Sequence, residues 1–272
     1  MRIRVPFGIA QQGKAFRNEI TMGQFVHRTV EFDLMEFEYF IHPSKWQETY
    51  DFWKEKMWRW AIDLGLDGKK LRWREHEAHE RSHYSKKTMD LEYQYPFGWN
   101  EMFGLAYRTD FDLKNHSLKS GQDLSYIDPK TNENYIPHVI EPTFGLGRLT
   151  GILIFDAYRE EEVNGNKRIY LKINPKLAPI KVAVFPLQKD DKLNSKARLI
   201  YDNLKINYKT EFDNAGNIGK MYRRQDEIGT PFCVTVDYET LKDETVTVRQ
   251  RDTMKQERIV IANLESYLNS KL

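Results

Sequence analysis

Apolar and polar residues alternate along residues 31–41. Phe32 and Leu34 fall on one side, and the other side carries the apolar series Met35, Phe37, Tyr39 and Ile41. This period of two predicts a long strand that also carries acidic residues. Residues 46–64 have helical spacing instead, with a stripe of large side chains at Trp46, Tyr50, Trp53, Met57 and Trp60. Such a stripe is typical of core packing, and Gly65 ends the predicted helix.

The rest of the first half reads as a series of strands with few helices. Strand-like runs are predicted at residues 71–74, 89–95, 100–109 and 135–141, with a polar stretch before the last of them. A helix at about 146–161 closes this region. Consecutive strands without intervening helices favour an antiparallel sheet over a doubly wound one, so we expect an α+β domain with flanking helices.

The pattern changes after the charged turn at residues 160–167. Predicted strands then alternate with predicted helices: strands at 181–185, 207–211, 232–236 and 245–249, helices at 190–204, 216–228 and 259–268. This alternation predicts a smaller α/β domain with a mostly parallel or mixed sheet. Pro175 and Pro179 punctuate the connection, so the two expected domains are 1–172 and 173–272.

Composition limits the possible functions. The chain has 272 residues, 13% of them aromatic, and a formal net charge of only +2. Nucleic-acid binding must therefore rest on local patches, because bulk charge does not support it. The single cysteine, Cys233, excludes an internal disulfide and a cysteine-based zinc site. No apolar run approaches the ~20 residues of a membrane helix, and the N-terminus lacks a signal-peptide pattern, so we expect a cytoplasmic protein with no membrane attachment.

Residues 141–148 read Glu-Pro-Thr-Phe-Gly-Leu-Gly-Arg and lead into an apolar helical run. Gly145 and Gly147 would let the backbone approach a ligand closely, and Arg148 would lie on the first turn of the helix. A helix N-terminus that carries an arginine is a favourable site for phosphate. The alternative is a glycine-rich connector with Arg148 in a salt bridge.

A second arginine–glutamate pair lies far upstream, in Phe16-Arg17-Asn18-Glu19. If these residues form a strand, Arg17 and Glu19 share one face. Turn-prone residues 21–24 would then lead back through Arg28 into the strand at 31–41, where Phe32 could stack on a planar base. The alternative is a surface ladder of salt bridges across a hairpin. Two arginines from separate elements would bind both ends of a polyphosphate, so nucleotide chemistry is the leading hypothesis.

These segments, in this order, resemble the motifs of class II aminoacyl-tRNA synthetases. Residues 16–19, the loop to Arg28 and residues 31–36 resemble motif 2, and residues 141–148 resemble motif 3. Other runs resemble glycyl-tRNA synthetases in particular: residues 74–76, 93–101, 108–113, 219–232 and 245–252. The resemblance covers almost the whole chain. It implies an antiparallel class II catalytic domain followed by an α/β anticodon-binding domain.

The resemblance also implies roles for individual residues. The ATP-binding residues would be Arg17, Asn18, Glu19, His27, Arg28, Phe32, Glu101, Met102, Gly145, Gly147 and Arg148. Arg17 would bind the α-phosphate and Arg148 the γ-phosphate, which makes them the expected catalytic arginines. The glycine pocket would comprise Phe32, Glu36, Arg108, Glu141 and Thr143. Glu101 would contact the Mg²⁺ that accompanies ATP.

The implied reaction is the ATP-dependent charging of tRNA-Gly. The carboxylate of glycine would attack the α-phosphorus in line, and the terminal ribose hydroxyl of the tRNA would then attack the adenylate. Because the carboxylate is already ionised, no general base is needed, and positioning, arginines and Mg²⁺ supply the catalysis. Carboxylates and a pocket too small for a methyl group would select glycine. The expected partners are glycine, ATP and tRNA-Gly, and the complete enzyme is expected to be a homodimer.

The chain also departs from the family pattern. Motif 1, which builds the dimer interface, and an Arg-Pro-Glu-Thr-Ala-Gln segment that reaches the substrate have no counterpart here. Leu34 stands where glutamine is usual, and Thr143 stands where serine is commoner. Three explanations stay open: a split or truncated enzyme completed by another, N-terminal polypeptide, a misassigned start, or a non-catalytic synthetase-like subunit that binds nucleic acid. Retention of both phosphate arginines and the pocket acids favours an enzyme.

Overall fold

The computed structural model describes residues 3–272, and its internal contacts divide the chain into two compact units. Unit 1 ends at Leu153, and unit 2 comprises Ile154–Leu272. Helix α3 (Leu146–Ala157) contains this division. The division precedes the domain boundary that the sequence predicts between residues 172 and 173, and the limits of the functional domains stay a prediction.

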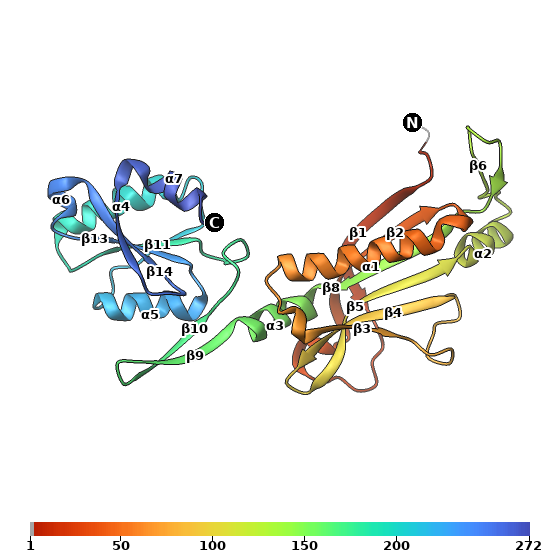
Figure 1. Cartoon of the computed structure of the whole chain (residues 1–272), viewed down its shortest axis with the longest axis horizontal. Helices are drawn as coiled ribbons and strands as arrows, with labels where there is room; N and C mark the ends of the chain where they lie inside the picture. The colour runs from red at the N-terminus through yellow and green to blue at the C-terminus, as the bar shows by residue number, and fades with distance from the viewer. Residues whose placement is uncertain (1–2) are drawn as a thin grey trace. The chain divides into compact units, whose positions relative to one another are not determined.

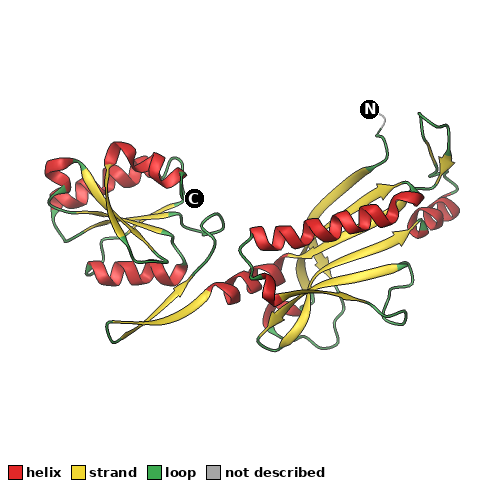
Figure 2. Cartoon of the chain, in the orientation of Figure 1, coloured by secondary structure: helices red, strands yellow, loops and turns green. Residues whose placement is uncertain are grey.

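Unit 1 is built on an antiparallel sheet of six strands in the order β1-β2-β8-β5-β4-β3 (Figure 1, Figure 2). Its strands are β1 (Phe7–Phe16), β2 (Glu31–Ile41), β3 (Leu71–Glu75), β4 (Lys87–Tyr95), β5 (Gly98–Thr109) and β8 (His138–Gly145). A small ribbon, β6 (Tyr126–Ile127) with β7 (Asn134–Tyr135), precedes β8. Because β8 lies beside β2, residues 141–145 adjoin residues 31–36, which follow the upstream arginine motif.

One face of this sheet is apolar and packs against helix α1 (Trp46–Asp63). Trp60 stacks on Phe103 with ring centroids 5.4 Å apart, and Trp46 stacks on Tyr107 at 4.6 Å. The side chains expected on the apolar side of residues 31–41 all belong to this core: Met35, Phe37, Tyr39 and Ile41. Burial of each large apolar side chain contributes about 1.5–3 kcal/mol, so this contact fixes the sheet against α1.

We call the opposite face of the sheet the polar face. Phe32 and Glu36 of β2 lie on it, and the register places Thr143 of β8 directly opposite Glu36. In β5 the small residues Gly104 and Ala106 lie opposite Thr143 and Glu141, which leaves space above the middle of the sheet. The pairing of β4 with β5 skips Met102 through a β-bulge. The bulge reverses the alternation, so that Glu101 also reaches the polar face.

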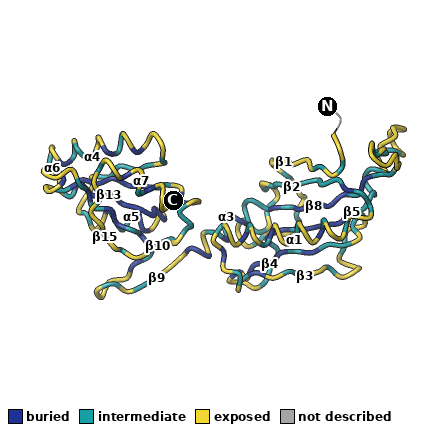
Figure 3. Tube along the Cα trace, turned by 45° about the horizontal axis from the view of Figure 1, so that its top comes forward, coloured by how far each residue is buried: buried dark blue, intermediate teal, exposed yellow. Residues whose placement is uncertain are grey.

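Unit 2 contains a mixed sheet of five strands in the order β12-β11-β13-β14-β15. Its strands are β11 (Val182–Pro186), β12 (Thr210–Phe212), β13 (Phe232–Val236), β14 (Thr245–Gln250) and β15 (Gln256–Val260). Its helices are α4 (Asp191–Leu204), α5 (Ile218–Ile228), α6 (Thr240–Asp243) and α7 (Leu264–Asn269). Helices α4 and α7 pack on one apolar face of the sheet and α5 packs on the other, so that β11 and β13 are buried along their whole length (Figure 3).

Several elements differ from those expected. The helix expected at 146–161 ends at Ala157, and the hairpin of β9 (Tyr158–Val163) and β10 (Asn166–Leu171) follows. Its turn is Asn164-Gly165, with φ angles of 51° and 74°, a pair that favours a two-residue hairpin turn. The helix expected at 259–268 begins only at Leu264, because residues 256–260 pair with β14 as an edge strand.

Two further differences lie in unit 1. The polar stretch after Thr109 contains helix α2 (Phe111–Ser120), which ends at Gly121 with a φ of 71°. The strand expected at 135–141 is displaced, since β8 begins at His138 and continues to Gly145. Glu141 therefore lies in the middle of a strand, where its neighbours in β5 and β2 determine its environment.

Candidate active site

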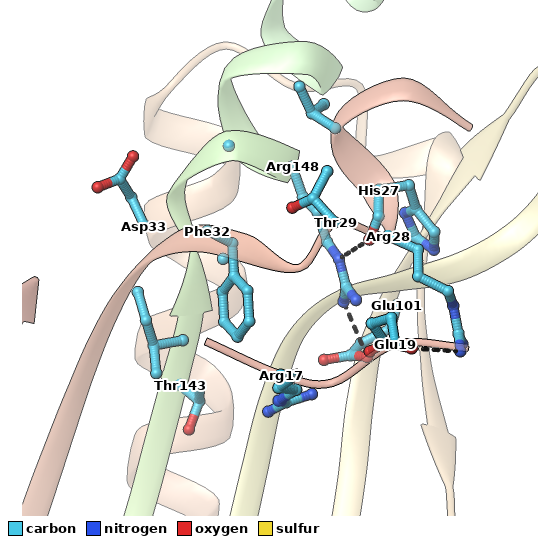
Figure 4. Close-up of a pocket in the computed structure, with 14 residues that line it drawn as sticks. Arg17, Glu19, His27, Arg28, Thr29, Phe32, Asp33, Glu101, Thr143 and Arg148 are labelled. Carbon is cyan, nitrogen blue, oxygen red and sulfur yellow. Dashed lines mark hydrogen bonds and ion pairs between the residues drawn. The ribbon is translucent and has the colours of Figure 1, made fainter. Parts of the chain in front are cut away.

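A pocket opens on the polar face of unit 1, where β2, β8 and the start of α3 meet the loop at residues 17–30 (Figure 4). It is lined by Arg17, Glu19, Val26, His27, Arg28, Thr29, Phe32, Asp33, Leu34, Glu101, Thr143, Gly145, Gly147 and Arg148. Nine of these are among the eleven ATP-binding residues expected from the sequence. The fold therefore brings both arginine motifs to one pocket.

Arg17 follows the last residue of β1 and does not lie in the strand. The expectation that Arg17 and Glu19 share a strand face is wrong, because β1 ends at Phe16 and the chain turns into the loop. The Arg17 amide still donates to the Val30 carbonyl oxygen at 2.9 Å. Its guanidinium lies over the Phe32 ring, 5.2 Å from the ring centroid.

Glu19 joins the two ends of this loop. Its Oε2 atom accepts a hydrogen bond from Arg28 Nη1 at 3.2 Å. The predicted ladder of salt bridges across a hairpin is thus reduced, at these positions, to one ion pair within the loop. Glu19 is thus paired within the loop, and the guanidinium of Arg17 lies beside the aromatic ring of Phe32.

Arg148 lies on the first turn of α3, as expected, and reaches over the pocket (Figure 4). Its Nε atom donates to the His27 carbonyl oxygen at 2.9 Å, and its Nη1 atom lies 2.8 Å from Glu101 Oε2. A Cβ atom at position 145 would lie 3.4 Å from Arg148 Cδ, so the arginine stem packs directly against Gly145. Arg148 was expected either to bind phosphate or to form a salt bridge. It does form a salt bridge, and because the partner carboxylate also lines the pocket, phosphate binding stays compatible with it.

His27 is a neutral wall of the pocket at physiological pH. Its half-buried ring meets Tyr95 and Phe97 edge to face, with centroids 5.1 Å and 5.6 Å away. Burial, and then the charge of Arg148, lower the pKa of His27 to about 4. The pocket therefore carries its positive charge on arginines and not on this imidazole.

Further along the polar face, Arg108 binds two carboxylates. Its Nη1 atom pairs with Glu141, and its Nε atom donates to Asp112 Oδ2 at 2.7 Å. Its guanidinium also lies 4.0 Å from the centroid of the Tyr84 ring. Thr143 donates to Glu141 at 3.3 Å and lines the pocket as well, so this group adjoins the pocket. We call Glu36, Glu38, Arg108, Asp112 and Glu141 the acid cluster.

The acid cluster holds more negative charge than Arg108 can neutralise. Burial raises the pKa of Glu141 although Arg108 opposes the shift. Burial, and then the neighbouring Glu141, raise the pKa of Glu38 to about 7. Burial alone would lower the pKa of Arg108, but Asp112 and Glu141 raise it. Arg108 is thus always charged, and its carboxylate neighbours compete for it.

Two expected ATP-binding residues lie outside the pocket lining, as do Glu36, Arg108 and Glu141 of the expected glycine pocket. Two members of the acid cluster were not expected. Asn18 does not line the pocket, and Met102 is fully buried in the apolar core, so a contact from Met102 to ATP could come only from its backbone. Glu38 was missed although it follows Glu36 at the strand period of two. Asp112 was missed because it lies at the start of α2 whereas Arg108 lies near the end of β5, and no single period relates two residues across that turn.

The chain is similar to known proteins at two levels: one part of unit 2 matches a domain family, and the whole chain matches part of longer proteins. Residues 181–271 match the family described as anticodon binding domain, so unit 2 carries an anticodon-binding domain. The whole chain is 52% identical to Glycine--tRNA ligase of Clostridium acetobutylicum, over 272 residues, and 51% identical to that of Caldanaerobacter subterraneus, over 271 residues. It is 50% identical to Glycine--tRNA ligase of Streptomyces coelicolor, over 279 residues.

The chain is therefore homologous along its entire length to glycine–tRNA ligases, and the resemblance seen in its motifs is confirmed. It spans 58% of the first two relatives and 61% of the third. In the part of the chain that the structure describes, no helix is both long enough and apolar enough to span a membrane.

Proposed function

We propose that this chain acts in glycine–tRNA ligation: it activates glycine with ATP to form glycyl-adenylate and transfers the glycyl group to the 3′ end of tRNA-Gly. The observation that carries the proposal is the pocket in which Arg17 and Arg148, from separate motifs, flank Phe32 and adjoin the acid cluster. Cations for phosphates, an aromatic ring for a base and carboxylates for an ammonium group are the functional groups that such an adenylation needs.

In this proposal each side chain has a distinct task. Phe32 stacks on the adenine ring, Arg17 binds the α-phosphate where the bond forms, and Arg148 binds the γ-phosphate. Negative charge spreads over the phosphoryl oxygens during the in-line attack, and arginines already in position stabilise it without reorganisation. Because the glycine carboxylate is ionised at neutral pH, the nucleophile needs no base.

Mg²⁺ would accompany ATP and neutralise phosphate charge. Within residues 3–272, no group of three or more His, Cys, Asp or Glu side chains is arranged to hold a metal ion. Mg²⁺ at nucleotide sites is held mainly by phosphates and water, with one or two protein carboxylates. Glu101, whose carboxylate lies in the pocket beside Arg148, fits that smaller demand.

The glycine pocket is proposed at Phe32, Glu36, Arg108, Glu141 and Thr143. Glu36 and Glu141 would receive the ammonium group, and Arg108 would be available to the substrate carboxylate. Thr143 lies between the two subsites, since it lines the pocket and binds Glu141. Exclusion of larger amino acids would follow from space, because extra methyl groups in a packed site cost about 1–3 kcal/mol.

We further propose that residues 1–172 form the class II catalytic region and residues 173–272 the anticodon-binding region. The match of residues 181–271 supports the second assignment. The proposed partners are tRNA-Gly, glycine and ATP in the cytoplasm. The complete enzyme is proposed to be a homodimer, and a polypeptide that supplies motif 1 is a proposed further partner.

The test is glycine-dependent exchange of labelled pyrophosphate into ATP. The wild-type chain is expected to exchange with glycine and not with alanine, and Arg148→Ala is expected to lower the rate by about 10²–10³-fold. Arg59→Ala, which removes an exposed arginine from α1, serves as the matched control and should leave exchange unchanged. A parallel reaction with an added polypeptide that bears motif 1 tests that partner. Binding of tRNA-Gly without exchange in either reaction would favour a non-catalytic protein.

A further inference from the structure

The acid cluster contains two carboxylates that are left without a partner. Within residues 3–272, neither Glu36 nor Glu38 has a hydrogen bond or ion pair to its carboxylate. Arg108 is occupied by Glu141 and Asp112. Half-buried carboxylates are poorly hydrated, and keeping several of them charged near one another costs free energy. A further cation would lower that cost in this part of the polar face.

The register of the sheet brings Glu38 close to this gap. Glu36 pairs with Thr143, and Tyr39 pairs with Ile140, so Glu38 falls directly opposite Glu141 in β8. Like charges that face each other across a ladder destabilise it. Arg108 already pairs with Glu141, so the unbalanced charge falls on Glu38, which is favoured either to take up a proton or to pair with a further cation.

Among the described residues, the charged groups that act most strongly on Glu38 include one cation. On its β1 side, Glu38 faces Ile9, which is apolar. The charged groups that act on Glu38 are Glu141 from β8, Arg108 from β5, Glu36 from its own strand and Asp112 from α2. Together they count three carboxylates and one guanidinium, and that guanidinium is already paired twice.

We propose that Glu38 is a further substrate-binding residue of the glycine pocket, whose carboxylate receives the substrate ammonium group together with Glu36 and Glu141 and releases a proton as that ammonium group arrives. The inference rests on the proposed function, because it assumes that an α-amino acid binds here. The ammonium group supplies the missing cation, and the proton of Glu38 passes to the buffer. Glycine is thereby selected against acids of the same size that have no positive charge.

A raised affinity of Glu38 for protons supports this assignment. Burial and Glu141 bring the pKa of Glu38 to about 7, so its carboxyl group is about half protonated at pH 7. A bound ammonium group favours the charged carboxylate and lowers that pKa again. Binding of glycine at pH 7 should then release about half a proton for each glycine bound.

The experiment is calorimetric titration of the 272-residue chain with glycine at pH 7, in buffers with different ionisation enthalpies. For the wild-type chain the measured heat should change with the buffer and give about half a proton released. Glu38→Gln should abolish the release and weaken glycine binding by roughly 5–10-fold. Glu38→Asp should restore part of the release, which a merely structural role would not predict.

Two controls separate the possible failures. Glu31→Gln alters an exposed carboxylate of the same strand that pairs with Lys14, and it should leave proton release unchanged. Glycolate, which has a hydroxyl group in place of the ammonium group, should release no proton from the wild-type chain. Glycine binding with a heat independent of buffer, or release retained in Glu38→Gln, overturns the role of Glu38 alone. No glycine binding by the wild-type chain contradicts the proposed function and the inference together.

Discussion

Each unit of the chain holds a cluster of arginines and carboxylates, and the two clusters are built differently. In unit 2, Asp226 accepts hydrogen bonds from Arg168 at 2.9 Å and from Arg249 at 2.8 Å and 3.0 Å. The side chains of Arg168 and Asp226 are 0% and 1% exposed. In the acid cluster of unit 1, one guanidinium pairs with two carboxylates, and Glu36 and Glu38 have no partner within residues 3–272.

The difference separates a structural cluster from the proposed glycine pocket. The remaining groups of Arg168 are also satisfied, since Nη1 pairs with Glu161 at 2.6 Å and Nη2 donates to the Arg251 carbonyl oxygen at 2.6 Å. In this network two buried arginines pair with the buried Asp226, and these contacts tie β10, α5 and β14 together. The acid cluster instead has two carboxylates that pair with no cation in the described part of the chain, and the proposed function assigns that place to a substrate ammonium group.

The largest effect is expected when the structural cluster is broken. Asp226→Asn removes the buried counter-charge of Arg249 and leaves Arg168 with Glu161 alone, which should destabilise unit 2 by about 3–5 kcal/mol. All six tryptophans precede residue 100 and lie in unit 1, so their fluorescence reports that unit alone. Urea unfolding should therefore show an earlier transition by circular dichroism and an unchanged one by tryptophan fluorescence.

A matched variant calibrates that result. Asp202→Asn removes a carboxylate that pairs with Lys205 on the surface, where the two side chains are 44% and 50% exposed. Its effect on the free energy of unfolding should stay within about 0.5 kcal/mol. Equal shifts for Asp226→Asn and Asp202→Asn would mean that the buried cluster is not structural.

The next effect concerns the aromatic ring in the pocket. Phe32→Leu keeps an apolar side chain and removes the stacking surface beside Arg17. Base stacking on an aromatic side chain contributes about 1–3 kcal/mol, so the KM for ATP in pyrophosphate exchange should rise by about 5–100-fold. The KM for glycine should change less. Phe16→Leu, at a ring that is 69% exposed, is the control that should not alter either constant.

The smallest effect is a pH dependence of stability that Glu38 creates. Its pKa is raised from the usual 4.5 to about 7, so between these values the folded chain holds a proton that the unfolded chain has released. The free energy of unfolding should therefore fall as pH rises from 4.5 to 7, by on the order of 1 kcal/mol after allowance for partial exposure. Urea unfolding of Glu38→Gln should lack this decline, and a decline of equal size in both proteins would assign it to another group.

The sequence allowed most of the fold to be predicted where one pattern dominated. The period of two in residues 31–41 and the aromatic stripe of α1 identified β2 and the helix that covers the sheet. Prediction was wrong where tertiary pairing overrode local pattern. A helix was predicted from residue 259 onward, yet residues 256–260 form a strand because β14 offers an antiparallel partner.

Many residues that line the pocket could be predicted as well, because the short motifs specify individual positions in the sequence. The geometry that links them could not. The bulge at Met102 brings Glu101 to the polar face, and no local signal distinguishes that bulge from a regular strand. The charge imbalance around Glu38 depends on the order of β2, β8 and β5, which joins residues more than a hundred positions apart.

The central claim is that the unmatched carboxylates of unit 1 bind the substrate and do not hold the fold together. Glycine-dependent pyrophosphate exchange by Glu36→Gln, measured beside its urea midpoint and its ATP affinity, tests this claim most directly. We predict a loss of exchange of about 10²-fold or more, with an unchanged midpoint and unchanged ATP binding. Exchange at the wild-type rate, or a loss of exchange that is accompanied by an equal loss of stability, would contradict the account.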